Sequence, residues 1–212
     1  MTTLTVSRPR EAVRLDQAVP GVLLFVLAAQ FMTVIMLGAS MAPGYDFGQG
    51  AISDLGVIGE TALLFNVSLI AVGLLNIAAG WLLWSRHGKP WILPVFGIAG
   101  LGAAGAGLFP LNSSDLHGIF ALVAFLFFNL QALACSTIVR GPMRAISLLA
   151  GAVGLVFVVI MVIGDSGNPA IFGPIGHGGA ERMIVYPSML WMLAYGGYLM
   201  AGRRDEAEHG SR

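Results

Sequence analysis

Six long apolar stretches, separated by short polar or Gly- and Pro-rich breaks, dominate the pattern along the chain. Each is close to the roughly 20 residues that a helix needs to cross a bilayer, and none carries a charge in its interior. The runs are continuously apolar, whereas the strands of an outer-membrane barrel alternate. The stretches are Ala18–Met41, Thr61–Trp84, Trp91–Phe109, His117–Val139, Ala145–Gly164 and Arg182–Ala201. The pattern predicts an all-α, polytopic membrane protein with six transmembrane helices in one bundle.

The chain divides into an N-terminal segment 1–17, a transmembrane domain 18–201 and a C-terminal tail 202–212. Lys and Arg accumulate in the cytoplasmic segments of membrane proteins. An even number of spans places both terminal segments and two of the connections on one side, which then carries ten of the eleven basic residues. These are Arg8, Arg10, Arg14, Arg86, Lys89, Arg140, Arg144, Arg203, Arg204 and Arg212. We therefore predict a cell-membrane protein with both termini in the cytoplasm.

The composition supports a membrane protein whose main partner is the lipid bilayer. Hydrophobic residues make up 57% of the 212 positions and charged residues only 10%, whereas a soluble domain has about 25% charged residues. The formal net charge is zero, which argues against nucleic-acid binding because that requires a clustered positive excess. The single cysteine, Cys135, excludes an internal disulfide and a zinc site built from several thiolates.

Small residues recur at four-residue spacing in two of the predicted helices. Such ladders allow two helix backbones to approach closely. They are Ala99–Ala103–Gly107, Gly102–Ala106 and Ala150–Gly154. Two interpretations are open: packing between helices of one chain, or the seam of a homodimer.

Several uncharged polar residues lie within the predicted spans. They would be costly if they faced lipid, so we expect them to face the bundle interior and form hydrogen bonds between helices. They are Gln30, Thr33, Asn66, Asn76, Asn129 and Gln131. The alternative is a polar pathway through the bundle, as in a transporter, but no charged residue accompanies them at mid-depth.

The predicted outward side collects acidic residues from all three of its loops. It carries Asp46, Asp54, Glu60, Asp115, Asp165 and Glu181. Arg182 is its only basic residue, and His117 and His177 lie there as well. The pairs Ser53–Asp54 and Ser114–Asp115 each precede a predicted helix, so we interpret them as helix caps. The clustering of carboxylates and imidazoles on one face makes it the candidate site.

Short motifs on this side resemble a known family. The first loop contains Pro43-Gly-Tyr-Asp46 and then Ala51-Ile-Ser-Asp-Leu-Gly56, and two shorter segments are His117-Gly118 and Gly179-Ala-Glu-Arg182. These segments are similar to those of a bacterial and archaeal six-span membrane family known only as a domain of unknown function (number 998). The resemblance implies the six-span topology and transfers no activity.

The first hypothesis for the outward cluster is a polar cavity that is structural or binds a lipid headgroup or small ligand. Arg182 would form an ion pair with Asp54, Asp115 or Glu181 and so lock the outer ends of the hairpins together. The candidate binding residues are Tyr45, Asp46, Ser53, Asp54, Asp115, His117, His177, Glu181 and Arg182. On this hypothesis the histidines are hydrogen-bonded residues of the cavity.

The second hypothesis is a divalent metal site, for example for zinc. Its ligands would be Asp54, Asp115, His117 and His177, with Glu181 in support, because carboxylates and imidazoles bind such ions and an open position can activate water. The protein would then be a metal-dependent intramembrane hydrolase that acts on a lipid or amide at the outer leaflet. The third hypothesis is a small transporter or a partner in a membrane complex.

Overall fold

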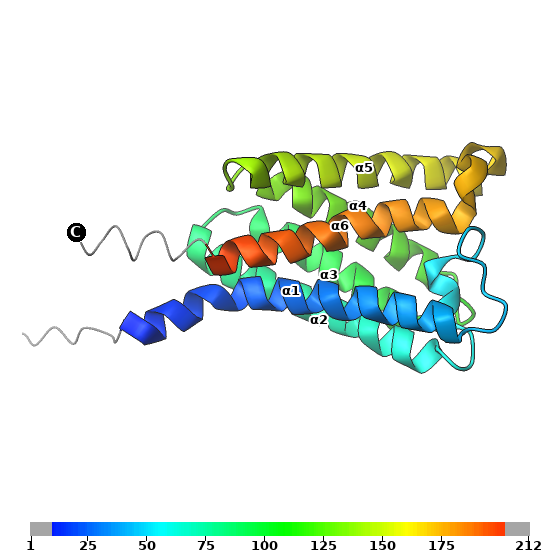
Figure 1. Ribbon diagram of the computed structural model, residues 1–212, viewed down its shortest axis with the longest axis horizontal. Coiled ribbons are helices and arrows are strands. Elements are labelled where there is room, and N and C mark those ends of the chain that lie inside the picture. Colours follow the sequence, from blue (N-terminus) through cyan, green and yellow to red (C-terminus); the bar gives the residue numbers. More distant parts are fainter. Residues whose placement is uncertain (1–9, 202–212) are drawn as a thin grey trace, which may run out of the picture.

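The fold is all-α, as predicted, with no strand among the residues that the structure describes. The structure is a computed structural model that describes residues 10–201, with side chains from residue 18 onward (Figure 1). The elements are α1 (Arg10–Met41), η1 (Ile52–Gly56), α2 (Ala62–His87), α3 (Ile92–Leu108), α4 (Leu116–Cys135), α5 (Pro142–Asp165), η2 (Pro169–Ile175) and α6 (Gly176–Ala201). The tail 202–212 and the side chains of segment 1–17, including its three arginines, lie outside the described residues.

The helices run alternately up and down, and each packs against the next in the chain (Figure 1). Helix α6 returns to α1 and also touches α4, so α1, α2, α3, α4 and α6 surround the centre of the bundle. Helix α5 packs against α4 and α6 at the edge of the bundle. The centre is therefore formed by five helices, with the sixth outside them.

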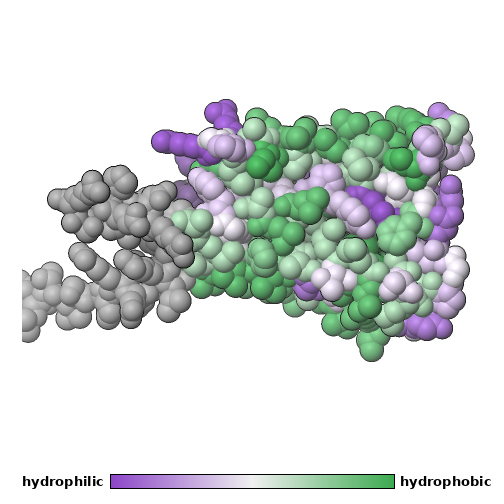
Figure 2. All heavy atoms as spheres, viewed as in Figure 1, coloured by the Kyte–Doolittle hydropathy of each residue, from purple (hydrophilic) through white to green (hydrophobic). Residues whose placement is uncertain are grey.

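Four helices are long and apolar enough to cross a membrane: Ala18–Met41 of α1, α2, α4 and α5. Helix α3 is apolar but has 17 residues, about 26 Å at the usual rise per residue. Helix α6 has 26 residues and carries Glu181 and Arg182 in its second turn. Apolar side chains predominate between the two ends on the face that Figure 2 shows. The chain is a multi-pass membrane protein.

Several helices extend beyond the predicted spans, most of all α1, which begins at Arg10 and not at Ala18. Two further differences have a local physical reason. Helix α6 begins at Gly176 and not at Arg182, because both charged side chains find partners inside the protein and do not need to end the helix. Helix α4 ends at Cys135, before the predicted Val139. The hydroxyls of Ser136 and Thr137 donate to the carbonyls of Leu133 and Ala134, a pattern that competes with continuation of the helix.

Most of the polar residues within the spans connect different elements, as expected. Asn76 and Gln131 exchange two hydrogen bonds of 3.0 and 3.1 Å between α2 and α4, and Asn76 also donates to the carbonyl of Phe96 on α3. Gln30 on α1 pairs with Ser68 on α2. Thr33 is the exception, because its hydroxyl donates to its own helix at Ala29. These bonds satisfy polar groups that would be costly in an apolar bundle.

The glycines of α3 bring it close to both of its neighbours. A Cβ on Gly100 would collide with the backbone of Gly73 on α2, and one on Gly102 would collide with the backbone of Ala124 on α4. On α5, Gly154 lies against the side chain of Asn129 on α4. The small residues therefore serve packing within the chain, the first of the two interpretations above.

Candidate functional site

The three loops predicted to share one side lie at one end of the bundle (Figure 1). We call it the acidic end, because all six acidic residues between 18 and 201 lie in these loops or in the helix turns next to them. The opposite end carries Arg86, Lys89, Arg140 and Arg144 and is called the basic end. The only described basic residue at the acidic end is Arg182.

The carboxylate of Glu181 lies inside the protein and is bound by the loop between α1 and α2, here called the α1–α2 loop (residues 42–61). The residue is 3% exposed. Its side chain accepts hydrogen bonds from the backbone N–H of Ile52 and, at 3.0 Å, from the hydroxyl of Ser53. A buried carboxylate without donors would be strongly unfavourable, so these two bonds fix η1 against α6.

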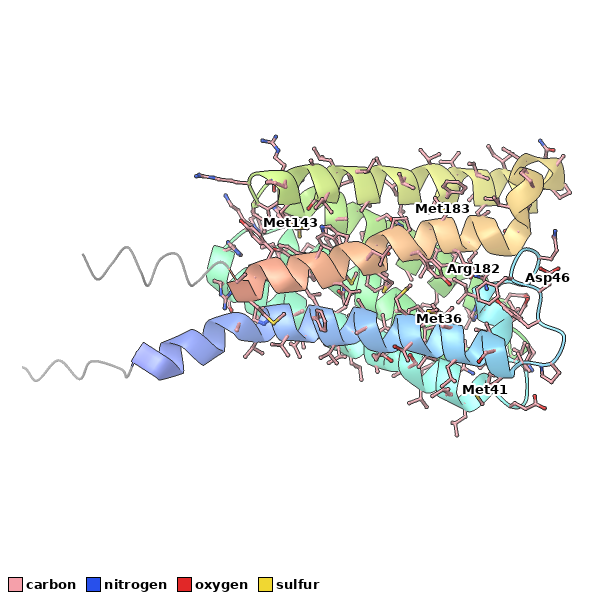
Figure 3. All side chains as sticks on the ribbon, in the orientation of Figure 1. Met36, Met41, Asp46, Met143, Arg182 and Met183 are labelled. Carbon is pink, nitrogen blue, oxygen red and sulfur yellow. The ribbon has the colours of Figure 1, made fainter. Side chains whose placement is uncertain are left out.

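The neighbouring Arg182 binds the same loop through different groups. One Nη donates to the carbonyls of Gly50 and Gly178, at 3.0 and 2.7 Å, and the other donates to the hydroxyl of Tyr45 at 2.7 Å. The guanidinium carbon lies 4.4 Å from the centre of the Phe47 ring, within the range of cation–π attraction. Figure 3 places Arg182 on the side of α6 that faces the loop carrying Asp46.

The predicted ion pair of Arg182 with a carboxylate is wrong. Among the described residues, the one ion pair within 4.0 Å joins His177 to Asp165. A guanidinium offers five donors in a fixed fork, and the loop carbonyls and the phenol of Tyr45 take up both of its Nη groups. Arg182 is therefore held by uncharged acceptors.

Tyr45 connects Arg182 to a later part of the α1–α2 loop through two hydrogen bonds. Its hydroxyl accepts from Arg182 and donates to the carbonyl of Ala51 at 2.6 Å. Partial burial raises the pKa of Tyr45 above its ordinary value, while the hydrogen bond and charge of Arg182 act in the opposite direction. The phenol is therefore protonated at neutral pH and keeps the proton that it donates.

Glycines on both segments allow the α1–α2 loop to touch the start of α6. The N–H of Gly179 donates to the carbonyl of Gly48 at 3.1 Å. A Cβ on Gly178 would collide with the backbone of Gly50, and one on Gly176 with that of Gly48. This contact between Gly48–Gly50 and the start of α6 was not predicted from the sequence. The paired glycine-rich segments are the signal that could have indicated it.

A pocket of about 610 Å³, here called the acidic pocket, opens between α4, α5, α6 and the α1–α2 loop. Five of the predicted binding residues line it, together with Asp165, which was predicted to lie on the same side but was not among the candidate binding residues. The five are Ser53, Asp54, His117, His177 and Glu181. No Lys or Arg of the described chain is among its lining residues.

A second, smaller cavity of about 50 Å³ lies inside the five-helix ring and is here called the inner cavity. It shares Ser53, His117 and Glu181 with the acidic pocket, as well as Ala121 and Phe125 of α4. Most of its other lining side chains are aliphatic or aromatic. The acidic pocket and the mostly apolar inner cavity therefore adjoin, and the polar residues Ser53, His117 and Glu181 lie at their boundary.

His117 lies at this boundary with an unused nitrogen. The residue is 4% exposed, and its Nδ1 lies 3.1 and 2.9 Å from the carbonyl oxygens of Ala106 and Phe109. Both partners are acceptors, so Nδ1 carries the proton. The other nitrogen, Nε2, is buried without a hydrogen-bond partner, and in the tautomer with the proton on Nδ1 it is a hydrogen-bond acceptor.

The remaining predicted residues lie outside the acidic pocket. Asp46 accepts from the backbone N–H groups of Gly48 and Gln49 in an exposed turn. Asp115 is exposed at the start of α4, without a side-chain capping bond. The predicted capping of α2 by Ser53–Asp54 is wrong, because Asp54 accepts from the N–H of Ala51 and caps η1.

Three of the four predicted metal ligands line the acidic pocket, but Asp115 does not. In the part of the chain that the structure describes, no three His, Cys, Asp or Glu side chains form a group that could hold a metal ion. His177 is engaged with Asp165 at 3.2 Å and packs edge-on against the Phe172 ring. Asp115 stands apart at the start of α4. The arrangement offers polar groups to a ligand, without a metal-binding cluster.

Residues 25–198 match the family described as Protein of unknown function (DUF998), and the chain belongs to that family. The match confirms the resemblance seen in the loop motifs. No curated protein matches the chain at a significant level, and neither does any solved structure. Function must therefore be inferred from the site.

We expect Arg182→Met to lower the free energy of unfolding by about 2–3 kcal/mol, because hydrogen bonds to a charged group are lost while the side-chain length is kept. Thermal unfolding in detergent, followed by tryptophan fluorescence, measures the change. Arg140→Met is the control, because it removes an exposed cation at the basic end. Equal stability of the two variants would contradict the assigned role of Arg182.

Proposed function

We propose that this member of a family of unknown function crosses the cell membrane six times, with the acidic end outside and both termini in the cytoplasm. The four basic residues of the basic end support this orientation, because Lys and Arg favour the cytoplasmic side. Single cysteines introduced at Asp46 and at Arg140 test it, since the native Cys135 is buried. An impermeant thiol reagent added to intact cells should label position 46 and not 140; the reverse pattern contradicts the orientation.

We further propose that the acidic pocket binds a small cationic amphiphile, namely an organic amine that carries a short apolar group. Ligand sites of proteins are typically concave and apolar, with a few converging polar groups. The acidic pocket and the inner cavity together offer this combination. The proposal concerns binding and assigns no reaction to the protein.

The charge of the acidic pocket favours a cation. Asp54, Asp165 and Glu181 line it, and no Lys or Arg does so among the described residues. Arg182 is directed to the α1–α2 loop, so it does not neutralise these carboxylates through an ion pair. A cleft lined by one sign of charge concentrates ligands of the opposite sign.

The observation that carries the proposal is the unpartnered Nε2 of His117. A buried acceptor without a donor is unfavourable, and this nitrogen lies where the acidic pocket meets the inner cavity. An ammonium group has three donors and no acceptor. It can donate to Nε2 of His117 and face the carboxylates, while its apolar group enters the inner cavity.

Butylammonium is a suitable probe, because its chain is short and it dissolves in water. We expect it to raise the unfolding temperature of the purified protein. At 100 times its Kd, butylammonium should increase the free energy of unfolding by about 2.7 kcal/mol. Butyrate and butanol at the same concentrations are the matched ligands with opposite charge and with none. Isothermal titration calorimetry measures the binding directly.

Ala121→Phe places a ring at the boundary of the two spaces and should abolish the effect of butylammonium. Ile119→Phe is the matched control, because Ile119 is 60% exposed on the same helix and lines neither space. Comparison of the two variants distinguishes a ring that blocks the site from a ring that only perturbs helix α4. The proposal fails if butyrate stabilises the protein equally, or if Ala121→Phe binds butylammonium as the unchanged protein does.

A further inference from the structure

A third pocket, of about 520 Å³, lies at the basic end of the bundle, which is opposite to the acidic end (Figure 1). We call it the basic pocket. It lies where α2 ends, where α4 gives way to the connection 136–141, and where α5 begins. Its lining residues are His87, Lys89, Ser136, Thr137, Ile138, Val139, Arg140 and Arg144. None of the acidic-end residues contributes to it.

Among the described residues, the basic pocket gathers positive charge and no negative charge. Lys89, Arg140 and Arg144 line it, and no acidic residue is among its lining residues. Every acidic residue between 18 and 201 lies at the acidic end. Long nitrogen-tipped side chains extend from this end of α5, close to Met143 (Figure 3). Like charges that share a concave site repel each other unless an anion joins them.

The start of α5 adds to the positive potential. The helix has 24 residues and begins at Pro142, so its dipole presents a positive end here. Pro142 has no N–H, and the N–H of Arg144 donates to the carbonyl of Gly141 just before the helix. A cation in this first turn, such as Arg144, is unfavourable with respect to the dipole. An anion in the basic pocket would interact favourably with the helix end and with the arginines together.

We propose that the basic pocket binds a phosphate group. Arg offers paired donors that match phosphate oxygens, and Lys supplies a point charge. The hydroxyls of Ser136 and Thr137 donate to helix carbonyls, so Lys89, Arg140 and Arg144 supply the side-chain donors. These three side chains are exposed, so they can reorient towards a bound phosphate.

Two sources can supply this chemistry. One is the phosphomonoester headgroup of an anionic lipid, because the basic pocket lies at the ends of apolar helices, where basic sites attract anionic headgroups. The other is free inorganic phosphate from the aqueous phase. The same residues would bind either, so the experiment compares the two.

The test measures two anions on the purified full chain in low-salt detergent solution. Radiolabelled inorganic phosphate is measured by equilibrium dialysis. Dioctanoyl phosphatidic acid is measured by calorimetry, with dioctanoyl phosphatidylcholine as the uncharged control. R140Q/R144Q removes two charges from the basic pocket, and R203Q/R204Q removes two charges from the tail. We expect R140Q/R144Q to weaken binding at least about tenfold and R203Q/R204Q to change it little.

The outcomes separate the sources and test the site. Binding of phosphatidic acid without phosphate identifies a lipid headgroup as ligand, and comparable binding of both identifies the phosphate group alone; either supports the basic pocket. No binding of either anion, or equal weakening by both double variants, overturns the proposal. Equal binding of phosphatidylcholine also overturns it. Tryptophan-monitored unfolding confirms that the variants are folded, and K89Q provides a second, single-charge test of the same pocket.

Discussion

The arrangement of the acidic end depends on the burial of two adjacent ionisable side chains, one acidic and one basic, that do not pair with each other. Glu181 and Arg182 are 3% and 7% exposed, and no ion pair joins them. Removing a charge from water is expensive unless hydrogen bonds satisfy it. Each side chain finds those bonds in the α1–α2 loop, Glu181 at Ile52 and Ser53 and Arg182 at Gly50 and Tyr45. The loop is thus a structural part of the bundle.

The fixed loop in turn shapes the space where a ligand would bind. Ser53 and Asp54 line the acidic pocket because η1 is held against α6, and His117 faces the same space from α4. The zero net charge of the chain conceals this organisation. Of the described residues, Asp54, Asp165 and Glu181 line the acidic pocket, whereas Lys89, Arg140 and Arg144 line the basic pocket at the opposite end of the bundle. The two proposed sites therefore have opposite ligand preferences.

The sequence predicts the helices well and the partners of the buried charges poorly. Long apolar runs determine helix number directly, because few other structures satisfy so many apolar residues in a bilayer. The side of the bundle on which Ser53, His117 and Glu181 meet also follows from the spacing of the spans. The partners of Arg182 cannot be predicted in this way. Two of them are the backbone carbonyls of Gly50 and Gly178, and every residue has such a carbonyl. The same holds for Nδ1 of His117, which is bound by two backbone carbonyls.

The coupling between Arg182 and Tyr45 tests the central claim most directly, because it isolates one contact between α6 and the loop. A double-mutant cycle of Tyr45→Phe and Arg182→Met, followed by thermal unfolding of the purified protein, measures that coupling. The account predicts that the double variant is less destabilised than the sum of the single variants by about 1 kcal/mol or more. Additive effects, within about 0.3–0.5 kcal/mol, would contradict the claim that Arg182 holds the loop through Tyr45.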